Sequence, residues 1–431
     1  MALLVTAGFA AVLEADGNQI NDATITYGAV FLGLCLVGHL FIRARLPHAD
    51  PYLYPIAALL SAVGIVMIYR IDQELARQQA QWFVLGLIVF CLTVLFLRDV
   101  DRLKQYRYTI AASAIGLLLL PRIIGFLTGG ANLTNGAYLT IDIGPVAFQP
   151  AEIAKLGIVV FVAAYLADTR GMLVRHERRF LGIAFPPLRY FGPMFLVWAL
   201  SMVMLVVIRD LGSSVMFFGV FLALLFVATN RASYAWLGLL MFVLGFIFVS
   251  HTVGHVDARL AAWQHPFVRE IYDADGGSYQ IAQSMFAQAD GGVFGVGLGN
   301  SLLGTPTHRI LPLPENDMIF AVVVSELGLA GGAALLLAYM LFAMRGFKAA
   351  MVASDPFVKL LATGLSTVFA LQVFVIVGGV TRVIPLTGVT LPWVAYGGSS
   401  IIANFILLAL LMIVSNQARR PETAAIEGTQ R

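Results

Sequence analysis

Charged residues are scarce in this chain. Asp, Glu, Lys and Arg make up only 12% of its 431 residues, whereas 59% of the residues are hydrophobic and the mean hydropathy is +0.86. Because soluble domains carry about 25% charged residues, this composition excludes a soluble globular protein and predicts one that resides in a bilayer. The net charge of +3 is too small to indicate a nucleic-acid partner.

Cysteines are also few, and strand-like patterns are missing. Cys35 and Cys91 both fall within apolar runs, so neither a disulfide framework nor a zinc site is predicted. The apolar runs do not alternate with polar residues, which excludes the strands of a membrane barrel. No internal repeat is visible, and this argues against a transporter built from inverted repeats. The fold class that fits is therefore all-α.

Long apolar runs are what the chain has instead. Runs that reach the roughly 17–25 residues needed to cross a bilayer occur near 27–44, 52–69, 79–97, 107–127, 150–167, 190–208, 211–228, 234–252, 318–344, 357–380 and 398–414. Residues 1–13 form a further, shorter run without the basic start of a signal peptide, which we interpret as a short first helix. The sequence predicts a polytopic integral membrane protein with about 11–12 transmembrane helices.

The lysines and arginines predict how these helices are oriented. Most of the 27 basic residues fall in the segments assigned to the cytoplasm, which are 45–51, 98–107, 168–189, 229–233, 345–356 and the C-terminal tail. The basic segment 168–189 is expected to bind anionic membrane lipids. The outer side then carries two long loops, 128–149 and 253–316, of which the second is the largest extramembrane segment.

The chain is predicted to consist of three parts. Residues 1–51 hold extra N-terminal membrane helices, residues 52–414 form the polytopic core with the large extracytoplasmic loop 253–316, and residues 415–431 form a short cytoplasmic tail.

Two carboxylates stand where the large outer loop meets the next apolar run. Glu315 and Asp317 lie in the segment Leu311–Ala321, directly before that run. At a membrane surface the pKa and the hydrogen bonding of a carboxylate can be tuned for chemistry. The alternative is an inert acid that reaches out to water, and the other polar segments decide between the two.

An acid and a base open the helix predicted at 150–167. Pro150 suits the first turn of a helix, where a missing N–H costs nothing. Glu152 and Lys155 follow at a spacing of three, so they share one face and can pair. Because a single buried charge is costly, both should face the bundle interior or a wet cavity. The pair either locks helices together or lines a polar cavity for a charged substrate.

Two further charged segments leave alternatives open. Arg209 and Asp210 occupy a tight outer turn, where they either cap helix ends or add charge to the mouth of the same cavity. Arg259 and Trp263 begin the large loop. The arginine either binds phosphate oxygens in bidentate fashion or stacks on the tryptophan.

Glycine-rich and proline-rich segments predict irregular backbone near the membrane. Gly291–Gly299 has no surrounding βαβ unit, so we interpret it as a tightly bent re-entrant loop and not as a nucleotide-binding loop. Pro385–Trp393 and Tyr396–Ser400 predict a broken backbone that lines a cavity or is buried in protein.

Taken together, these segments resemble one family, the SEDS proteins (shape, elongation, division and sporulation), which are polytopic peptidoglycan polymerases. The matching segments occur in family order: Phe148–Lys155, Arg209–Ser213, Arg259–Pro266, Tyr279–Gly299, Leu311–Gly328 and Val377–Asn404. The most specific are Asp317 with the following Met-Ile-Phe-Ala, and Tyr396–Ser400 with Pro385–Gly388. The N-terminal runs and Gly378–Arg382 resemble the actinobacterial-type branch of RodA, FtsW and SpoVE relatives.

The resemblance implies a peptidoglycan glycosyltransferase of the bacterial plasma membrane, with its active site facing outward. Such an enzyme polymerises lipid II into glycan strands during cell elongation or division, transferring a glycan from its lipid pyrophosphate to the 4-hydroxyl of lipid II. The reaction requires a base for the hydroxyl proton and cationic help for the departing pyrophosphate.

The resemblance also assigns roles to residues. Asp317 matches the family's essential aspartate and is expected to be the catalytic base. The substrate-binding cavity is expected to contain Gln149, Glu152, Lys155, Asp210 and Arg259. Lys155 and Arg259 are assigned to pyrophosphate oxygens, and the carboxylates either orient them or hold a divalent cation such as Mg or Mn; no residue is assigned as a dedicated metal ligand.

One difference from the family keeps two other functions open. After Gly136-Ala137 the family usually shows an arginine and a tryptophan, where this chain reads Tyr138-Leu139-Thr140. The alternatives are a lipid II flippase and a non-catalytic scaffold of the cell-wall synthesis complex. In each case the resemblance implies a class B penicillin-binding transpeptidase as partner.

Overall fold

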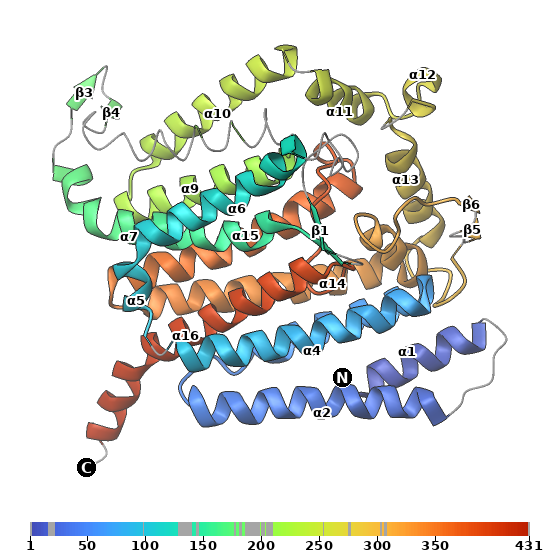
Figure 1. Ribbon diagram of the computed structural model, residues 1–431, viewed down its shortest axis with the longest axis horizontal. Helices are drawn as coiled ribbons and strands as arrows, with labels where there is room; N and C mark the ends of the chain where they lie inside the picture. Colours follow the sequence, from blue (N-terminus) through green and yellow to red (C-terminus); the bar gives the residue numbers. More distant parts are fainter. Residues whose placement is uncertain are drawn as a thin grey trace.

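A computed structural model describes most of the chain, namely residues 2–15, 22–97, 99–127, 140–143, 146–175, 178–180, 183–185, 199, 203, 210–252, 254–274, 277–301, 304–305 and 308–429. The described part is a bundle of long helices with three short hairpins (Figure 1).

The helices are α1 (Ala2–Ala15), α2 (Asp22–Arg45), α3 (Leu53–Ile71), α4 (Gln73–Phe96), α5 (Asp101–Gln105), α6 (Arg107–Leu127), α7 (Pro150–Arg175), α9 (Leu211–Thr229), α10 (Ala232–Thr252), α11 (Gly254–Gln264), α12 (Arg269–Tyr272), α13 (Tyr279–Gly291), α14 (Ile319–Val352), α15 (Pro356–Val380) and α16 (Gly398–Thr429). The antiparallel hairpins pair β1 (Ile141–Ile143) with β2 (Val146–Phe148), β3 (Arg178–Phe180) with β4 (Ile183–Phe185), and β5 (Gly304–Thr305) with β6 (His308–Arg309).

Within the described residues, nine helices are long and apolar enough to cross a membrane: α2, α3, α4, α6, α7, α9, α14, α15 and α16. Each covers one of the predicted apolar runs, so the prediction of an all-α polytopic membrane protein is confirmed. Shorter apolar helices over Leu3–Ala15 and Ala232–Phe248 correspond to the runs predicted at 1–13 and 234–252. The predicted span 190–208, Arg209 and Tyr138 lie outside the described residues.

Local sequence explains where several helices begin. The carboxylate of Asp72 accepts hydrogen bonds from the backbone N–H groups of Glu74 and Leu75 and so caps α4. Asp355 caps α15 in the same way, and Pro356 follows at the first helical position, where the missing N–H costs nothing. Each cap of this kind stabilises a helix by about 1 kcal/mol.

Helices α14, α15 and α16 form the centre of the bundle. In α16, 83% of the most apolar stretch is buried, compared with 28% in α2 and α6. The rings of Phe342, Phe369 and Trp393 meet in this centre, with centroids 4.3–5.4 Å apart. Helices α1 and α2 lie along one side of the bundle next to α4, and α10 lies along the opposite side (Figure 1).

The two ends of the bundle differ. Helices α11, α12 and α13 and the hairpin β5–β6 lie at one end, whereas α5, the hairpin β3–β4 and the C-terminus lie at the other (Figure 1). The amphipathic stretch predicted at Tyr279–Ala289 is confirmed as α13. The large loop 253–316 is therefore partly helical and gathers at one end of the molecule.

The glycine-rich loop wraps around a break in α14. Gly292 and Gly295 have positive φ angles, as the bent backbone predicted here requires, and α14 is broken at Gly328 with φ +70°. The backbone N–H of Val296 donates to the carbonyl oxygen of Ser325, 3.1 Å away, and that of Leu329 donates to Gly292, 2.9 Å away. The loop therefore supports the first turns of α14, which follow directly after Asp317.

A second irregular segment, residues 381–397, joins α15 to α16. It forms turns and extended backbone, and Gly388 and Trp393 have φ values of +72° and +60°. Thr387, Val389 and Trp393 are buried. The broken backbone predicted at Pro385–Trp393 is confirmed and runs through the protein interior, whereas the prediction for Tyr396–Ser400 was wrong from Gly398 onward, where α16 begins.

Candidate active site

Asp317 lies against the irregular segment 381–397. The carbonyl oxygen of Glu315 accepts a hydrogen bond of 2.8 Å from the backbone N–H of Tyr396, which fixes the turn before α14 to that segment. A β-carbon on Gly388 would lie 3.8 Å from Oδ2 of Asp317. The carboxylate therefore faces a glycine in the left-handed region, and it lies at the end of the bundle that carries the outer-loop helices.

The surroundings of Asp317 shift its titration. Burial raises the pKa of Asp317 to about 6; the Arg259 guanidinium opposes this rise, and the neighbouring Glu315 adds to it. A carboxyl group with this pKa is mostly ionised at neutral pH and is still basic enough to accept a proton. These are the properties that general-base catalysis requires.

Asp210 caps α9 beside the same guanidinium. Its side chain accepts hydrogen bonds from the backbone N–H of Ser213, at 2.9 Å, and from the Ser213 hydroxyl, at 2.5 Å. Burial raises the pKa of Asp210, whereas the Ser213 hydrogen bonds and Arg259 lower it. The capping alternative is confirmed for Asp210, and the shared influence of Arg259 also brings this carboxylate into electrostatic reach of the Asp317 site.

The start of α9 packs closely on the segment 381–397. A β-carbon on Gly212 would lie 2.3 Å from Cγ2 of Val389 and 3.1 Å from Cβ of Thr387, so only glycine fits there. Among the described side chains, Oγ1 of Thr387 and Oδ1 of Asn316 are buried without a hydrogen-bond partner. Buried polar atoms are normally paired, so these two, in residues adjacent to Gly388 and Asp317, offer contacts to a bound polar molecule.

Lys155 is held by two partners inside the bundle. Its Nζ lies 2.6 Å from Oε2 of Glu152 and 2.6 Å from Oε1 of Gln372, and Nε2 of Gln372 donates to the carbonyl oxygen of Thr390 at 2.8 Å. The lysine and the glutamate are 2% and 4% exposed. The predicted pairing of the two charges is confirmed, and the pair joins α7 to α15 and to the segment 381–397. Glu152 also raises the pKa of Asp210.

Gln149 stands at the entrance to α7. Its backbone N–H donates a hydrogen bond of 2.9 Å to Oγ of Ser399, in the first turn of α16. The hydroxyl of Ser400 accepts from Oγ1 of Thr390 at 2.8 Å. The start of α7 is thereby attached to the first turn of α16, which is itself bonded to the irregular segment at Thr390.

Arg259 is placed by a contact one turn further along α11. The indole N–H of Trp263 donates to the carbonyl oxygen of Arg382 at 3.0 Å, so the outer-loop helix is attached to the segment 381–397. Arg259 itself is partly exposed. Its guanidinium lowers the pKa of both Asp317 and Asp210. Contacts with residues 381–397 come from α7 through Gln372, and from α9, from α11 and from the turn before α14.

Two residues of this arrangement were missed from the sequence. Gln372 is 0% exposed within a transmembrane helix, and a polar side chain in an otherwise apolar span is the signal that would have found it. Arg70 forms an ion pair of 3.2 Å with the fully buried Glu326, which also accepts from the Ser301 hydroxyl at 2.6 Å. That pair holds the glycine-rich loop on α14, and nothing local in the sequence indicates it.

The acidic residues do not form a preformed cation site. Across the described ranges, no group of three or more His, Cys, Asp or Glu side chains is placed to hold a metal ion. Glu152 is engaged by Lys155, and Asp210 is engaged by Ser213. The donor set therefore does not fit a metal bound by protein ligands alone.

Comparison with known proteins agrees with this architecture. The family model of cell cycle proteins of the FtsW, RodA and SpoVE type matches residues 51–420. The chain belongs to this family. Helices α1 and α2 precede the matched segment.

Individual members of the FtsW, RodA and SpoVE family are similar over most of the chain. The peptidoglycan glycosyltransferase RodA of Mycobacterium tuberculosis is 40% identical over 427 residues, which cover 96% of this chain and 88% of that protein. Stage V sporulation protein E of Bacillus subtilis is 30% identical and covers 86% of this chain and 98% of that protein.

Solved structures share the fold. A chain from a peptidoglycan synthase complex that coordinates polymerization and crosslinking superposes with a TM-score of 0.68 at 24% identity, covering 86% of this chain and 99% of that chain. The rod shape determining protein RodA of Thermus thermophilus superposes with a TM-score of 0.59 at 24% identity, covering 86% of this chain and 98% of that chain. Both likenesses show the polytopic helical fold.

Proposed function

We propose that this protein is a peptidoglycan glycosyltransferase that polymerises lipid II into glycan strands at the outer face of the bacterial plasma membrane. The proposal is supported by membership of the FtsW, RodA and SpoVE family and by relatives named as peptidoglycan glycosyltransferases. The observation that carries it is the position of Asp317, which lies against Gly388 of the segment 381–397 at the end of the bundle with the outer-loop helices, where burial raises its pKa to about 6.

Asp317 is the base of the proposed reaction. Its carboxylate takes the proton of the lipid II 4-hydroxyl as that oxygen bonds to the anomeric carbon of the donor glycan. The bond between the anomeric carbon and the pyrophosphate oxygen breaks, and the lipid pyrophosphate leaves with the electron pair. Gly388, with φ +72°, lies next to this base, since a β-carbon on it would be 3.8 Å from Oδ2.

Arg259 and Lys155 supply positive charge for the departing pyrophosphate. Arg259 is partly exposed and can contact phosphate oxygens in bidentate fashion. Lys155 is buried and bonded to Glu152 and Gln372, so it contributes its positive charge from within the bundle. Glu152 holds Lys155 in place through their ion pair, the charge of Asp210 balances that of Arg259, and the backbone N–H of Gln149 fixes the entrance of α7.

The divalent cation stays a prediction. Because the described carboxylates form no group of three ligands, a Mg²⁺ or Mn²⁺ ion would take several ligands from pyrophosphate oxygens and water, as Mg²⁺ commonly does. Proton transfer to Asp317 does not require this carboxylate to bind the metal ion.

The proposed orientation and partner follow from the same family. The loop helices α11–α13 gather at the Asp317 end of the bundle (Figure 1), and the basic loops at the other end favour the cytoplasm for that side. A class B penicillin-binding transpeptidase is the proposed partner. Its support is the fold shared with a chain of a peptidoglycan synthase complex.

The deciding experiment is polymerisation of purified lipid II by the full-length protein together with its transpeptidase partner. Wild type is expected to form glycan polymer, and the Asp317→Asn and Asp317→Ala variants are expected to lose at least about a hundredfold in rate, the scale of general-base catalysis. Equal rates in wild type and variants would overturn the base assignment. Absence of polymer from wild type, with lipid II transport across vesicles or complex assembly unaffected by Asp317→Ala, would support the flippase or scaffold alternative.

A further inference from the structure

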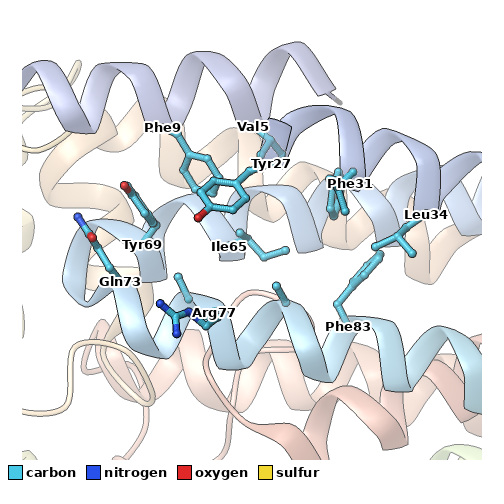
Figure 2. A pocket seen from close by; sticks show the side chains of 13 residues that line it. Val5, Phe9, Tyr27, Phe31, Leu34, Ile65, Tyr69, Gln73, Arg77 and Phe83 are labelled. Atoms are coloured by element: carbon cyan, nitrogen blue, oxygen red, sulfur yellow. The ribbon is translucent and has the colours of Figure 1, made fainter. Parts of the chain in front are cut away.

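A cavity of about 210 Å³ lies at the side of the bundle where α1 and α2 pack (Figure 2). Its walls come from α1, α2, α3 and α4. Because α1 and α2 precede the segment that the family model matches, half of the wall is built from helices outside the family core. None of the site residues assigned above lines this cavity.

The two ends of the cavity differ chemically. Tyr69, Gln73 and Arg77 gather at one end, and Phe31 and Phe83 line the other (Figure 2). Gln73 and Arg77 are four residues apart in α4 and therefore lie on the same face of that helix. The cavity thus joins a cationic, hydrogen-bonding end to an apolar channel.

The polar end lies at the depth of a headgroup layer on the active-site side. Gln78, next to Arg77, accepts a hydrogen bond of 2.5 Å from the Tyr396 hydroxyl, so this turn of α4 is level with the segment 381–397. From Gln73 to Phe83 the helix rises about 15 Å. That is half of the about 30 Å hydrocarbon core, which is the depth of one leaflet.

The cavity opens sideways into the bilayer. Its floor is buried, with Phe31 and Phe83 only 5% and 3% exposed, whereas the rim residues Val30 and Tyr27 on α2 are 56% and 55% exposed. Because α2 is one of the helices long and apolar enough to cross the membrane, the opening beside Val30 faces lipid chains and not water.

Arg77 is available to an anion. It forms an ion pair with Glu74 at 3.4 Å, but the two side chains are 72% and 59% exposed. An exposed pair of this kind contributes little, whereas a guanidinium binds phosphate oxygens through two parallel hydrogen bonds. A phosphate can therefore compete with Glu74 for this arginine.

We infer that this cavity is a binding site for an anionic phospholipid of the outer leaflet. Its phosphate binds Arg77 and Gln73, and one acyl chain fills the apolar part of the cavity as far as the rings of Phe31 and Phe83, which pack against each other with centroids 5.1 Å apart. The volume is below the about 300–1,000 Å³ that enclose a whole drug-sized ligand, so one chain enters and the rest of the lipid stays in the bilayer.

The bound lipid stabilises the packing of α1 and α2 on the core. The last residue of α1, Ala15, reaches the glycine-rich loop: a β-carbon on Gly299 would lie 2.5 Å from Cβ of Ala15. The backbone N–H of Gly299 in turn donates to Oε2 of Glu326 at 3.2 Å. Helix α1 therefore lines the lipid site with Val5 and Phe9 and contacts the loop that supports α14 at its other end.

Lipid retention by the purified full-length protein tests the headgroup contact. Native mass spectrometry would compare phosphatidylglycerol with phosphatidylcholine of the same acyl chains. Wild type is expected to retain phosphatidylglycerol about tenfold better, and Arg77→Gln is expected to abolish that preference. Arg269→Gln is the matched control, because Arg269 is 95% exposed on the outer loop and outside the cavity. Equal retention of the two lipids by wild type, or an unchanged preference in Arg77→Gln, would overturn the inference.

A second pair of variants tests the channel. Val30→Trp places a large ring at the rim, whereas Val37→Trp alters a residue that is 60% exposed two turns further along α2, on the same face. We expect Val30→Trp to lower phosphatidylglycerol retention about fivefold and Val37→Trp to leave it unchanged, with equal thermal melting. Equal effects of the two variants would contradict the channel, and displacement of phosphatidylglycerol by equimolar polyprenyl phosphate would assign the cavity to the prenyl carrier instead.

Discussion

Trp263 and Arg382 hold each other through reciprocal hydrogen bonds. The indole N–H of Trp263 donates to the carbonyl oxygen of Arg382 at 3.0 Å, and Nε of Arg382 donates to the carbonyl oxygen of Trp263 at 2.8 Å. A terminal nitrogen of Arg382 donates to the carbonyl oxygen of Gln264 at 2.9 Å, at the end of α11. This clasp satisfies C-terminal carbonyls of α11 and fixes the helix that carries Arg259, one turn earlier, whose charge lowers the pKa of Asp317.

Arg382→Ala is expected to displace Arg259 and lower kcat/KM for lipid II about tenfold. Because Arg259 lowers the pKa of Asp317, its displacement should also move the acidic limb of the pH–rate profile to higher pH. Arg382→Lys should recover part of the activity, since an ammonium group can still donate to the α11 carbonyls. A fall in rate with an unmoved acidic limb would indicate a purely structural role for the clasp.

The rate of polymerisation is expected to depend on the ionisation of Asp317. With a pKa of about 6, the carboxylate is about 90% ionised at pH 7 and about 10% ionised at pH 5, so the rate should fall about tenfold between these values as the base is protonated. The measurement is kcat/KM in buffers of constant ionic strength. An acidic limb near the ordinary carboxyl pKa would contradict the raised pKa of this group.

The same pKa predicts a gain of stability in the Asp317→Asn variant. The pKa of Asp317 is raised in the folded state above its unfolded value, so the folded state binds more protons between the two pKa values, and ionisation of this group opposes folding. The loss of unfolding free energy caused by ionised Asp317 is fully present above about pH 6 and vanishes below the pKa of this group in the unfolded chain. Asp317→Asn should therefore raise the thermal midpoint at pH 7 and leave it unchanged near pH 3.5, while it abolishes polymerisation.

The transmembrane helices could be predicted because the length of an apolar run and the residues that start a helix are read from neighbouring positions in the sequence. A long apolar run such as 357–380 specifies a span by itself, and Pro356 and Asp355 mark its start. The convergence of the site could not be derived in this way, because Lys155 meets Gln372 across 217 residues of chain and Trp263 meets Arg382 across 119. The family motifs indicated which residues belong together, but the partners that hold them became visible only when the segment 381–397 was placed among the helices.

Removing Lys155 alone is expected to be more harmful than removing the whole ion pair. Lys155→Met leaves Glu152 buried without its cation, which costs about 3–5 kcal/mol in comparable buried pairs. The double variant Glu152→Gln, Lys155→Met removes both charges and should regain a large part of that loss. Thermal unfolding in detergent measures both, and a double variant that is less stable than the single one would contradict a buried pair in which the two charges compensate each other.

Asp50 tests the cost of unpairing a buried charge at the other end of the bundle. It is 0% exposed and accepts from Arg345, with Nε 2.9 Å from Oδ2, and from Arg419, so it joins the turn before α3 to α14 and α16. Asp50→Asn leaves two arginines without a carboxylate and should cost about 3–5 kcal/mol of unfolding free energy. Because this cluster lies far along α14 from Asp317, the acidic limb of the pH–rate profile should stay where it is in wild type. A shifted limb in Asp50→Asn would mean that α14 transmits the disturbance along its length, across the break at Gly328.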